Sequence, residues 1–165
     1  MAQRFFKIAL VGLTVWSAAA TAAAAESKTL SHGLFQEELI TAKELRSLQK
    51  KRSDLIIFDA RSPRSFEDGH ISGAVLPRSK DFYDRALMFE KGIVRTPPDQ
   101  DEGLREGVKD IPRDKPIVTY CNEHCSASSV LLFKLKGLGF KNVRSMEEGY
   151  QVWEAKGYPV AKRPK

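Results

Sequence analysis

Two short runs of apolar, mostly β-branched residues constrain the fold of this chain more than any other feature. Residues 55–58 (Leu-Ile-Ile-Phe) end at Asp59, and residues 117–120 (Ile-Val-Thr-Tyr) lead directly into Cys121. Continuous apolar runs of this length are typical of strands buried on both faces, which occur mainly in parallel sheets. Helical signals follow each run, so the sequence predicts an α/β domain with a largely parallel sheet.

Capping residues predict where the helices begin and end. Thr41 with Glu44 three residues later forms a capping box at the start of one helix. Ser-Pro followed later by Gly predicts a short helix over 62–69. Apolar residues predict a longer helix over 126–139 and a last helix over 149–156.

Two further strands are expected at 72–78 and 143–146. The stretch 79–114 is the least regular part of the sequence. Within it, residues 81–91 are predicted to be helical, whereas residues 96–109 carry many charges and two glycines and are predicted to be a loop. Long loops in compact domains are usually functional or mobile.

The first 25 residues have the pattern of a secretory signal peptide. Arg4 and Lys7 form a positive n-region, the apolar run 8–16 follows, and an alanine-rich tail ends before the polar Glu26. The alternative is an uncleaved anchor, although the apolar part is only marginally long enough to span a bilayer. We therefore expect cleavage after residue 25 and a periplasmic or secreted protein.

The rest of the chain has the size of one domain, predicted as a lead-in (26–39) and a folded unit (40–162). The whole chain has 165 residues, 42% of them hydrophobic, enough for an ordinary core. Its net charge of +6 stays positive without residues 1–25, and basic and acidic residues alternate. This pattern does not indicate nucleic-acid binding. It favours small anionic substrates weakly, with no stable membrane association after cleavage; a protein partner is possible.

The chain has only two cysteines, Cys121 and Cys125, in one short segment. A disulfide scaffold would spread its cysteines along the chain. The pair therefore indicates chemistry or a local redox switch rather than architecture. Thioredoxin-type chemistry is disfavoured, because the spacing is C-x-x-x-C and not C-x-x-C.

Cys121 stands where a buried strand ends and a helix is about to begin. Ligand sites of open α/β sheets lie at this end of the strands. Loop amides and a helix N-terminus there favour negative charge, so a lowered thiol pKa and a stabilised persulfide anion are expected. The alternative is that Cys121 is an inert packing residue.

Four groups of residues occur in order along the chain. They are Asp59-Ala60-Arg61 with Phe66; 69–74 (Gly-His-Ile-Ser-Gly-Ala); Tyr120-Cys121; and Gly149, Tyr150 and Trp153 followed by 157–160 (Gly-Tyr-Pro-Val). Together they resemble the rhodanese-homology domains, over about residues 40–160. The chain is thus similar to a single-domain, exported member of that family.

The resemblance implies a central, mostly parallel five-stranded sheet flanked by helices, with no cofactor and no metal. It implies that Cys121 is the catalytic nucleophile of a sulfurtransferase. A small anionic donor such as thiosulfate gives its outer sulfur to Cys121, and a thiol or cyanide acceptor removes it later. Covalent catalysis of this kind splits one transfer into two displacements.

The loop after Cys121 is the expected substrate-binding site, and its predicted members are Asn122, Glu123, His124, Cys125, Ser126 and Ala127. Its six residues, 121–126, match the length in sulfurtransferases; the related cell-cycle phosphatases have one residue more and end in arginine. Many family members have glycine where His124 stands and a cation in the loop. Because this loop contains no cation, we expect it to bind an anion through backbone donors and His124, which disfavours efficient use of thiosulfate.

Three side chains, Arg61, His70 and His124, have two interpretations each. Arg61 is predicted either to contact substrate or to pair with Asp59 as framework, and His70 to hydrogen-bond within a turn rather than to act as an acid or base. His124 is either a donor that titrates near neutral pH or a solvent-facing side chain. No cluster has a convincing metal spacing, although Cys121 with its neighbours could bind an adventitious soft ion.

Three functions follow from these features. The first is sulfur transfer through a Cys121 persulfide. The second is a periplasmic thiol redox sensor or sulfur-binding module that uses a Cys121–Cys125 switch. The third is a catalytically idle domain that binds a partner through residues 79–114, which the intact cysteine disfavours.

Overall fold

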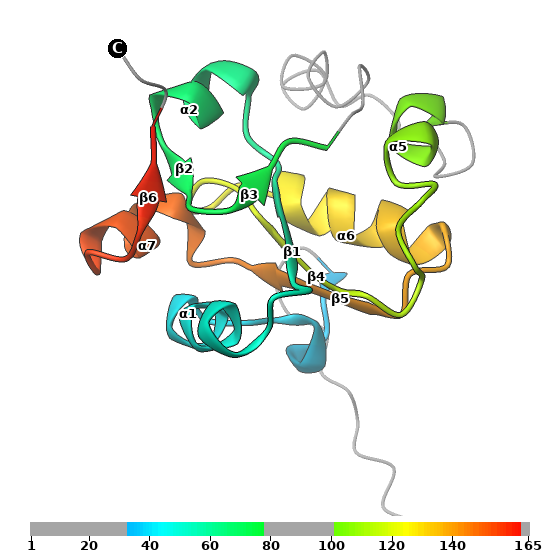
Figure 1. Ribbon diagram of the computed structural model, residues 1–165, viewed down its shortest axis with the longest axis horizontal. Coiled ribbons are helices and arrows are strands. Elements are labelled where there is room, and N and C mark those ends of the chain that lie inside the picture. Colours follow the sequence, from blue (N-terminus) through cyan, green and yellow to red (C-terminus); the bar gives the residue numbers. More distant parts are fainter. Residues whose placement is uncertain (1–32, 78–100, 163–165) are drawn as a thin grey trace, which may run out of the picture.

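The computed structural model describes residues 33–77 and 101–162. Its main sheet contains β1 (Ile56–Asp59), β3 (Ala74–Val75), β4 (Pro116–Tyr120) and β5 (Asn142–Met146). The strand order is β3-β1-β4-β5, and every neighbouring pair is parallel (Figure 1). The predicted α/β class with a parallel sheet is confirmed.

The main sheet has four strands in the described residues rather than the expected five. Beside β5, Leu39 makes only an isolated parallel bridge with Ser145, and the amide of Ile40 donates to the Ser145 carbonyl at 3.0 Å. The chain then enters a helix at Ala42, which leaves no length for a full strand. A separate antiparallel pair is formed by β2 (His70–Ile71) and β6 (Val160–Ala161).

The predicted strand at 72–78 is shorter in the structure. Gly73 has φ 82°, a left-handed conformation that glycine adopts without steric cost, and it turns the chain between β2 and β3. Only Ala74 and Val75 then pair with β1.

Helix boundaries follow the capping signals closely. Thr41 and Glu44 form the expected capping box on α1 (Ala42–Lys51), and the Ser62 hydroxyl accepts from the Ser65 amide at 3.2 Å. The remaining helices expected from the sequence are α2 (Pro63–Asp68), α6 (Ala127–Gly137) and α7 (Gly149–Ala155). A 3₁₀ turn, η2 (Gln36–Glu38), precedes α1.

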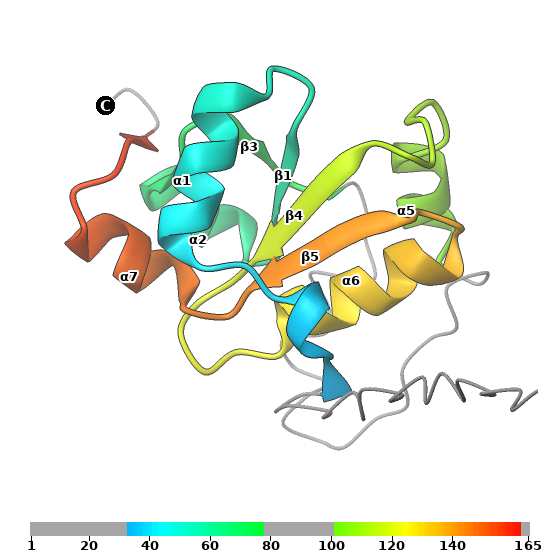
Figure 2. The same ribbon diagram turned by 90° about the horizontal axis from the view of Figure 1, so that it is seen from below.

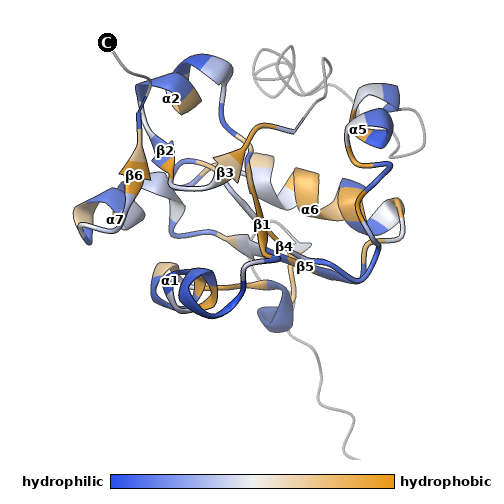
Figure 3. Cartoon of the chain, viewed as in Figure 1, coloured by the Kyte–Doolittle hydropathy of each residue, from blue (hydrophilic) through white to orange (hydrophobic). Residues whose placement is uncertain are grey.

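The two faces of the sheet are covered by different helices. Ile57 and Val118 pack with α1 and α7, whereas their chain neighbours Phe58 and Ile117 pack with α6. Figure 2 shows α6 on the opposite side of the strands from α1, and in Figure 3 the apolar colours follow the strands and α6. Each such side chain stabilises the fold by about 1.5–3 kcal/mol when fully buried.

Helix α5 (Glu102–Gly107) lies where the sequence predicted a loop over 96–109. The Asp101 carboxylate accepts from the Leu104 amide at 3.1 Å and caps the helix, and Leu104 is fully buried. Buried Lys134 of α6 pairs with Asp101 and fixes α5 to the core. A local cap therefore starts this short helix, and tertiary burial of Leu104 with the Lys134 pair stabilises it.

The structure includes only part of the remaining predicted segments. Leu34, in the predicted lead-in, is fully buried in the core. The predicted signal peptide (1–25) and the helix expected at 81–91 lie outside the described residues. Within the described ranges, none of the helices has the length and apolarity needed to cross a membrane.

Candidate active site

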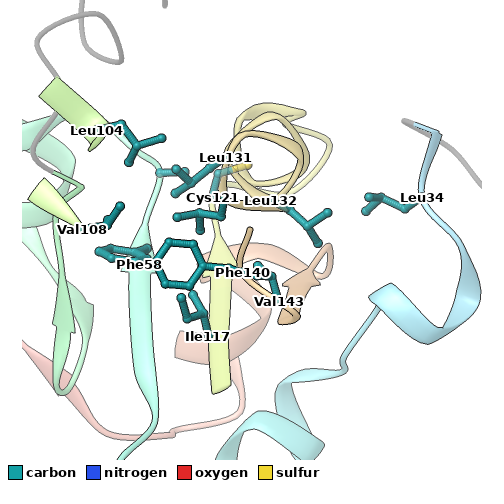
Figure 4. Packing of buried hydrophobic residues seen from close by; sticks show 12 residues of the cluster. Leu34, Phe58, Leu104, Val108, Ile117, Cys121, Leu131, Leu132, Phe140 and Val143 are labelled. Carbon is teal, nitrogen blue, oxygen red and sulfur yellow. The ribbon is translucent and has the colours of Figure 1, made fainter. Parts of the chain in front are cut away.

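Cys121 is the first residue after β4, at the carboxyl end of a central strand. The carbonyl oxygen of Cys121 accepts from the Tyr150 amide at 2.8 Å, which ties this strand end to α7. Its side chain is 1% exposed and lies in the core beside Leu131 and Leu132 of α6 (Figure 4). The position of Cys121 agrees with the sequence-based prediction. Its nearly complete burial was not predicted.

Two carbonyl oxygens accept hydrogen bonds from the Cys121 thiol. The acceptors are Cys125 at 2.9 Å and Asn122 at 3.3 Å. The hydroxyl of Ser128, in the first turn of α6, donates to the sulfur from 3.7 Å. The Cys121 sulfur therefore faces two acceptors from the loop and one donor from α6. The two acceptors favour the neutral thiol.

The pKa of Cys121 is raised, and the lowered pKa expected from the sequence is wrong for this conformation. The hydrogen bond and the charge of the Cys125 side chain raise it, as does burial. The amide and hydroxyl of Ser128 act in the opposite direction, because they stabilise a thiolate. Ser128 was not among the predicted site residues; its place in the first turn of the helix after Cys121 was the signal available.

The loop closes in a β-turn. The Cys125 amide donates to the Asn122 carbonyl at 3.3 Å, and His124 has φ 58°, the left-handed conformation that glycine adopts freely. The side chain of His124 is 89% exposed, and its ring lies 3.4 Å from the Glu123 carboxylate. His124 thus matches the solvent-facing interpretation, and its backbone shapes the turn that carries Cys125 back toward Cys121.

The last two predicted members of the loop lie at the start of α6. Ser126 is the N-cap residue, although its side chain makes no capping hydrogen bond. The amide of Ala127 donates to the Cys125 sulfur at 3.4 Å. The two cysteines are not joined by a disulfide in this structure, and their side chains interact with each other.

Two residues of α7 hold the loop, and neither was among the predicted site residues. The side chain of Gln151 accepts from the Glu123 amide at 2.9 Å and donates to the Asn122 side chain at 3.1 Å. Gly149 lies so close to the loop that a Cβ atom there would be 2.3 Å from the Glu123 nitrogen. The absence of a side chain at Gly149 is therefore a condition for this loop position.

Arg61 is part of the framework beneath the loop. Its side chain is 5% exposed and pairs with the fully buried Asp59 at 2.7 Å, and it donates to the Gly69 carbonyl at 2.6 Å. Burial alone would lower the pKa of Arg61, but the hydrogen bond and charge of Asp59 raise it overall. The guanidinium also lies 4.0 Å from the centre of the Tyr150 ring. These contacts favour the ion-pair interpretation over substrate contact.

Tyr120 connects this framework to the cysteine. Its hydroxyl donates to Asp59 at 2.5 Å and accepts from the Ile71 amide at 3.2 Å. Burial and the Asp59 charge raise the pKa of Tyr120, so it stays a neutral donor. Because Tyr120 directly precedes Cys121, the buried network fixes the end of β4.

His70 behaves as the turn residue that the sequence indicated. Its Nδ1 donates to the Phe66 carbonyl at 2.8 Å, and the two rings stack with centroids 3.7 Å apart. Trp153 and Tyr150 are buried in the core. In the described part of the chain, no group of three or more His, Cys, Asp or Glu side chains is arranged to hold a metal ion.

Comparison with known families agrees with this arrangement. The sequence-family model named rhodanese-like domain matches residues 41–156, which include the whole loop and the Asp59 network. The chain belongs to the rhodanese family.

Curated relatives of this rhodanese-family chain have different activities. It is 29% identical to the thiosulfate sulfurtransferase GlpE of Coxiella burnetii over 116 residues, 70% of this chain and 86% of that protein. It is 28% identical to the dual specificity phosphatase Cdc25 of Arabidopsis thaliana, over 74% of this chain and 77% of that protein. Membership in the family therefore leaves the reaction to be argued from the site.

Solved structures share the fold. The BH2092 protein of Bacillus halodurans superposes with a TM-score of 0.57 at 19% identity, over 77% of this chain and 78% of that one. The Alr3790 protein of Anabaena gives a TM-score of 0.54 at 22% identity, over 74% and 91% of the two chains.

Proposed function

We propose that this rhodanese-family protein transfers sulfane sulfur through a persulfide on Cys121. The observation that carries the proposal is the position of the Cys121 sulfur, at the carboxyl end of β4 and facing the donors of Ser128 in the first turn of α6. A helix N-terminus and its amides stabilise the negative charge of a thiolate or persulfide.

The reaction consists of two displacements. The Cys121 thiolate attacks the outer sulfur of a donor such as thiosulfate, the donor S–S bond breaks, and sulfite leaves with the electron pair. A thiol or cyanide acceptor then attacks the outer persulfide sulfur and releases the Cys121 thiolate. Ser128 stabilises the anion at each stage, and Gln151 with Gly149 holds the loop backbone in place.

The loop favours sulfur transfer over phosphate-ester hydrolysis, although a phosphatase is among the relatives. Residues 121–126 contain no arginine or lysine. Arg61 cannot substitute for one, because its guanidinium is occupied by Asp59 and the Gly69 carbonyl. A phosphate dianion would therefore lack the bidentate partner that arginine supplies. The persulfide intermediate carries less charge and depends less on a cation, whereas thiosulfate is also a dianion, so the loop favours sulfur donors of lower charge.

The proposal includes an exported setting and small partners. The N-terminal pattern of residues 1–25 supports export to a periplasmic or extracellular compartment. There the substrates would be a small anionic sulfur donor and a thiol acceptor. Detection of a mature N-terminus at residue 26 by protein sequencing would support export with cleavage, and recovery of the protein only in the cytoplasm would contradict export.

Mass spectrometry of the purified, reduced protein after exposure to thiosulfate or a polysulfide tests the transfer. Sulfur loading on Cys121 adds one sulfur atom, about 32 Da. The adduct, or sulfide released from it, should be absent from Cys121→Ser and present in Ser126→Ala, where the replaced side chain makes no capping hydrogen bond. Full transfer activity in Cys121→Ser would overturn the assignment.

A thiol redox sensor is the second candidate, and the direct interaction of the two thiols favours it. An oxidant that removes two electrons and two protons would join Cys121 to Cys125. This function predicts a mass loss of about 2 Da after mild peroxide treatment, with no need for a sulfur donor.

A further inference from the structure

Cys125 is a second nucleophilic side chain in the loop, and the two displacements proposed above do not use it. The β-turn from Asn122 to Cys125 brings the Cys125 carbonyl to 2.9 Å from the Cys121 sulfur, and the two side chains interact. The side-chain hydrogen bond between the two cysteines places their sulfurs within reach of each other. The two sulfurs are thus neighbours before any sulfur donor arrives.

The two sulfurs have different surroundings. Cys121 donates to two carbonyl oxygens, which oppose negative charge on its sulfur. The sulfur of Cys125 accepts a hydrogen bond from the Ala127 amide at 3.4 Å, which favours negative charge there. Cys125 is also more exposed than Cys121, so its proton can pass to water. Cys125 is therefore placed to act as the attacking thiolate and Cys121 as the sulfur that is attacked.

We propose that Cys125 discharges the Cys121 persulfide as hydrosulfide. The Cys125 thiolate attacks the inner sulfur, the Sγ atom of Cys121, and a disulfide bond forms between the two cysteines. The persulfide reacts in its protonated form, so when its S–S bond breaks the outer sulfur keeps this proton and leaves as hydrosulfide with the electron pair. The outer sulfur is reduced, the cysteine pair is oxidised, and the proton lost by Cys125 passes to water.

This inference rests on the proposed sulfur transfer and specifies its product. A protein without Cys125 would need an external thiol to remove the sulfur, whereas this chain releases it within the loop. A dithiol reductant then restores both thiols by thiol–disulfide exchange. The net reaction converts a sulfane sulfur into hydrosulfide at the expense of one dithiol.

The test uses the reduced full chain without air or added thiol. Wild type, Cys125→Ser and Cys125→Ala are each given one equivalent of thiosulfate or inorganic polysulfide, and intact mass and free sulfide are followed. Wild type should lose about 2 Da and release about one sulfide per chain. Both Cys125 variants should gain about 32 Da and release no sulfide.

The possible results distinguish failure of this inference from failure of the proposed sulfur transfer. If wild type keeps the added sulfur and releases no sulfide, the inference is wrong and sulfur transfer stands. The same holds if the Cys125 variants release sulfide as wild type does, or if peptide mapping finds the persulfide on Cys125. If neither donor loads any of the three proteins, the proposed function fails, and the inference fails with it.

Discussion

The Cys121 thiol donates to the carbonyl oxygen of Cys125 at 2.9 Å, so the nucleophile of this site rests as a neutral, buried group. A rhodanese loop that presents amides to the sulfur would stabilise the cysteine thiolate before a sulfur donor binds. In this chain the β-turn directs carbonyl groups at the sulfur, and Ser128 supplies the opposing donors. Ionisation of Cys121 is therefore the step that pH should control.

Alkylation of Cys121 by iodoacetamide should be slow at neutral pH and accelerate as the pH rises. Because the pKa of Cys121 is raised, the thiolate fraction increases about tenfold for each pH unit below that pKa. The Cys125 side chain is the largest cause of the shift, so Cys125→Ser should react faster at pH 8. Rates are measured by mass spectrometry; a pH-independent rate between pH 6 and 9 would contradict the raised pKa.

The same shift predicts a loss of stability in alkali. The folded pKa of Cys121 lies above the unfolded value of about 8.5, so its contribution to stability is complete below that pH. The contribution decreases as the pH rises further, because only the unfolded chain then ionises. Urea unfolding from pH 7 to 10 should show a decline that is smaller in Cys121→Ala, and equal declines would contradict the linkage.

Asp59→Asn should destabilise the protein more than Tyr120→Phe. The first variant leaves the buried Arg61 charge without its partner, at a cost of about 3–5 kcal/mol. The second leaves the Ile71 amide without an acceptor, at about 1–3 kcal/mol. Urea denaturation gives both values, and the reverse order would show that Arg61 finds another partner.

Gly149→Ala should disturb the active site, whereas Gly157→Ala should not. Both glycines have positive φ, 78° and 65°, so each alanine costs about 1–2 kcal/mol of backbone strain. Only the Cβ at Gly149 would collide with the loop backbone; nothing lies within 4 Å of the Cβ at Gly157. Sulfur loading of Cys121 should therefore decrease about tenfold or more only in Gly149→Ala, when the two variants are compared at a temperature at which both are folded.

The stability of His124 variants should depend on the backbone conformation at this position and not on the charge of the side chain. His124→Gly relieves the left-handed strain and should keep or raise the melting temperature. His124→Val should destabilise by about 1–2 kcal/mol, because β-branched residues rarely adopt φ 58°. Calorimetry measures both. If His124→Gly proves less stable than wild type, the imidazole itself contributes through Glu123.

The order of elements could be predicted from sequence because local signals determine it. The capping box at Thr41, the apolar run before Cys121 and the Ser-Pro start of α2 act through neighbouring residues. Helix α5 was missed for the opposite reason. Its stability comes from Leu104 in the core and from Lys134, which is distant in sequence.

The sequence by itself determined an α/β domain of the rhodanese type with a cysteine between a strand and a helix. It could not determine which groups face that sulfur. The direction of a carbonyl or an amide depends on the φ and ψ angles of the loop, and Gln151 and Gly149 of α7 fix the loop from outside it. Only the tertiary structure placed the Cys125 carbonyl, the Cys125 thiol and Ser128 around Cys121.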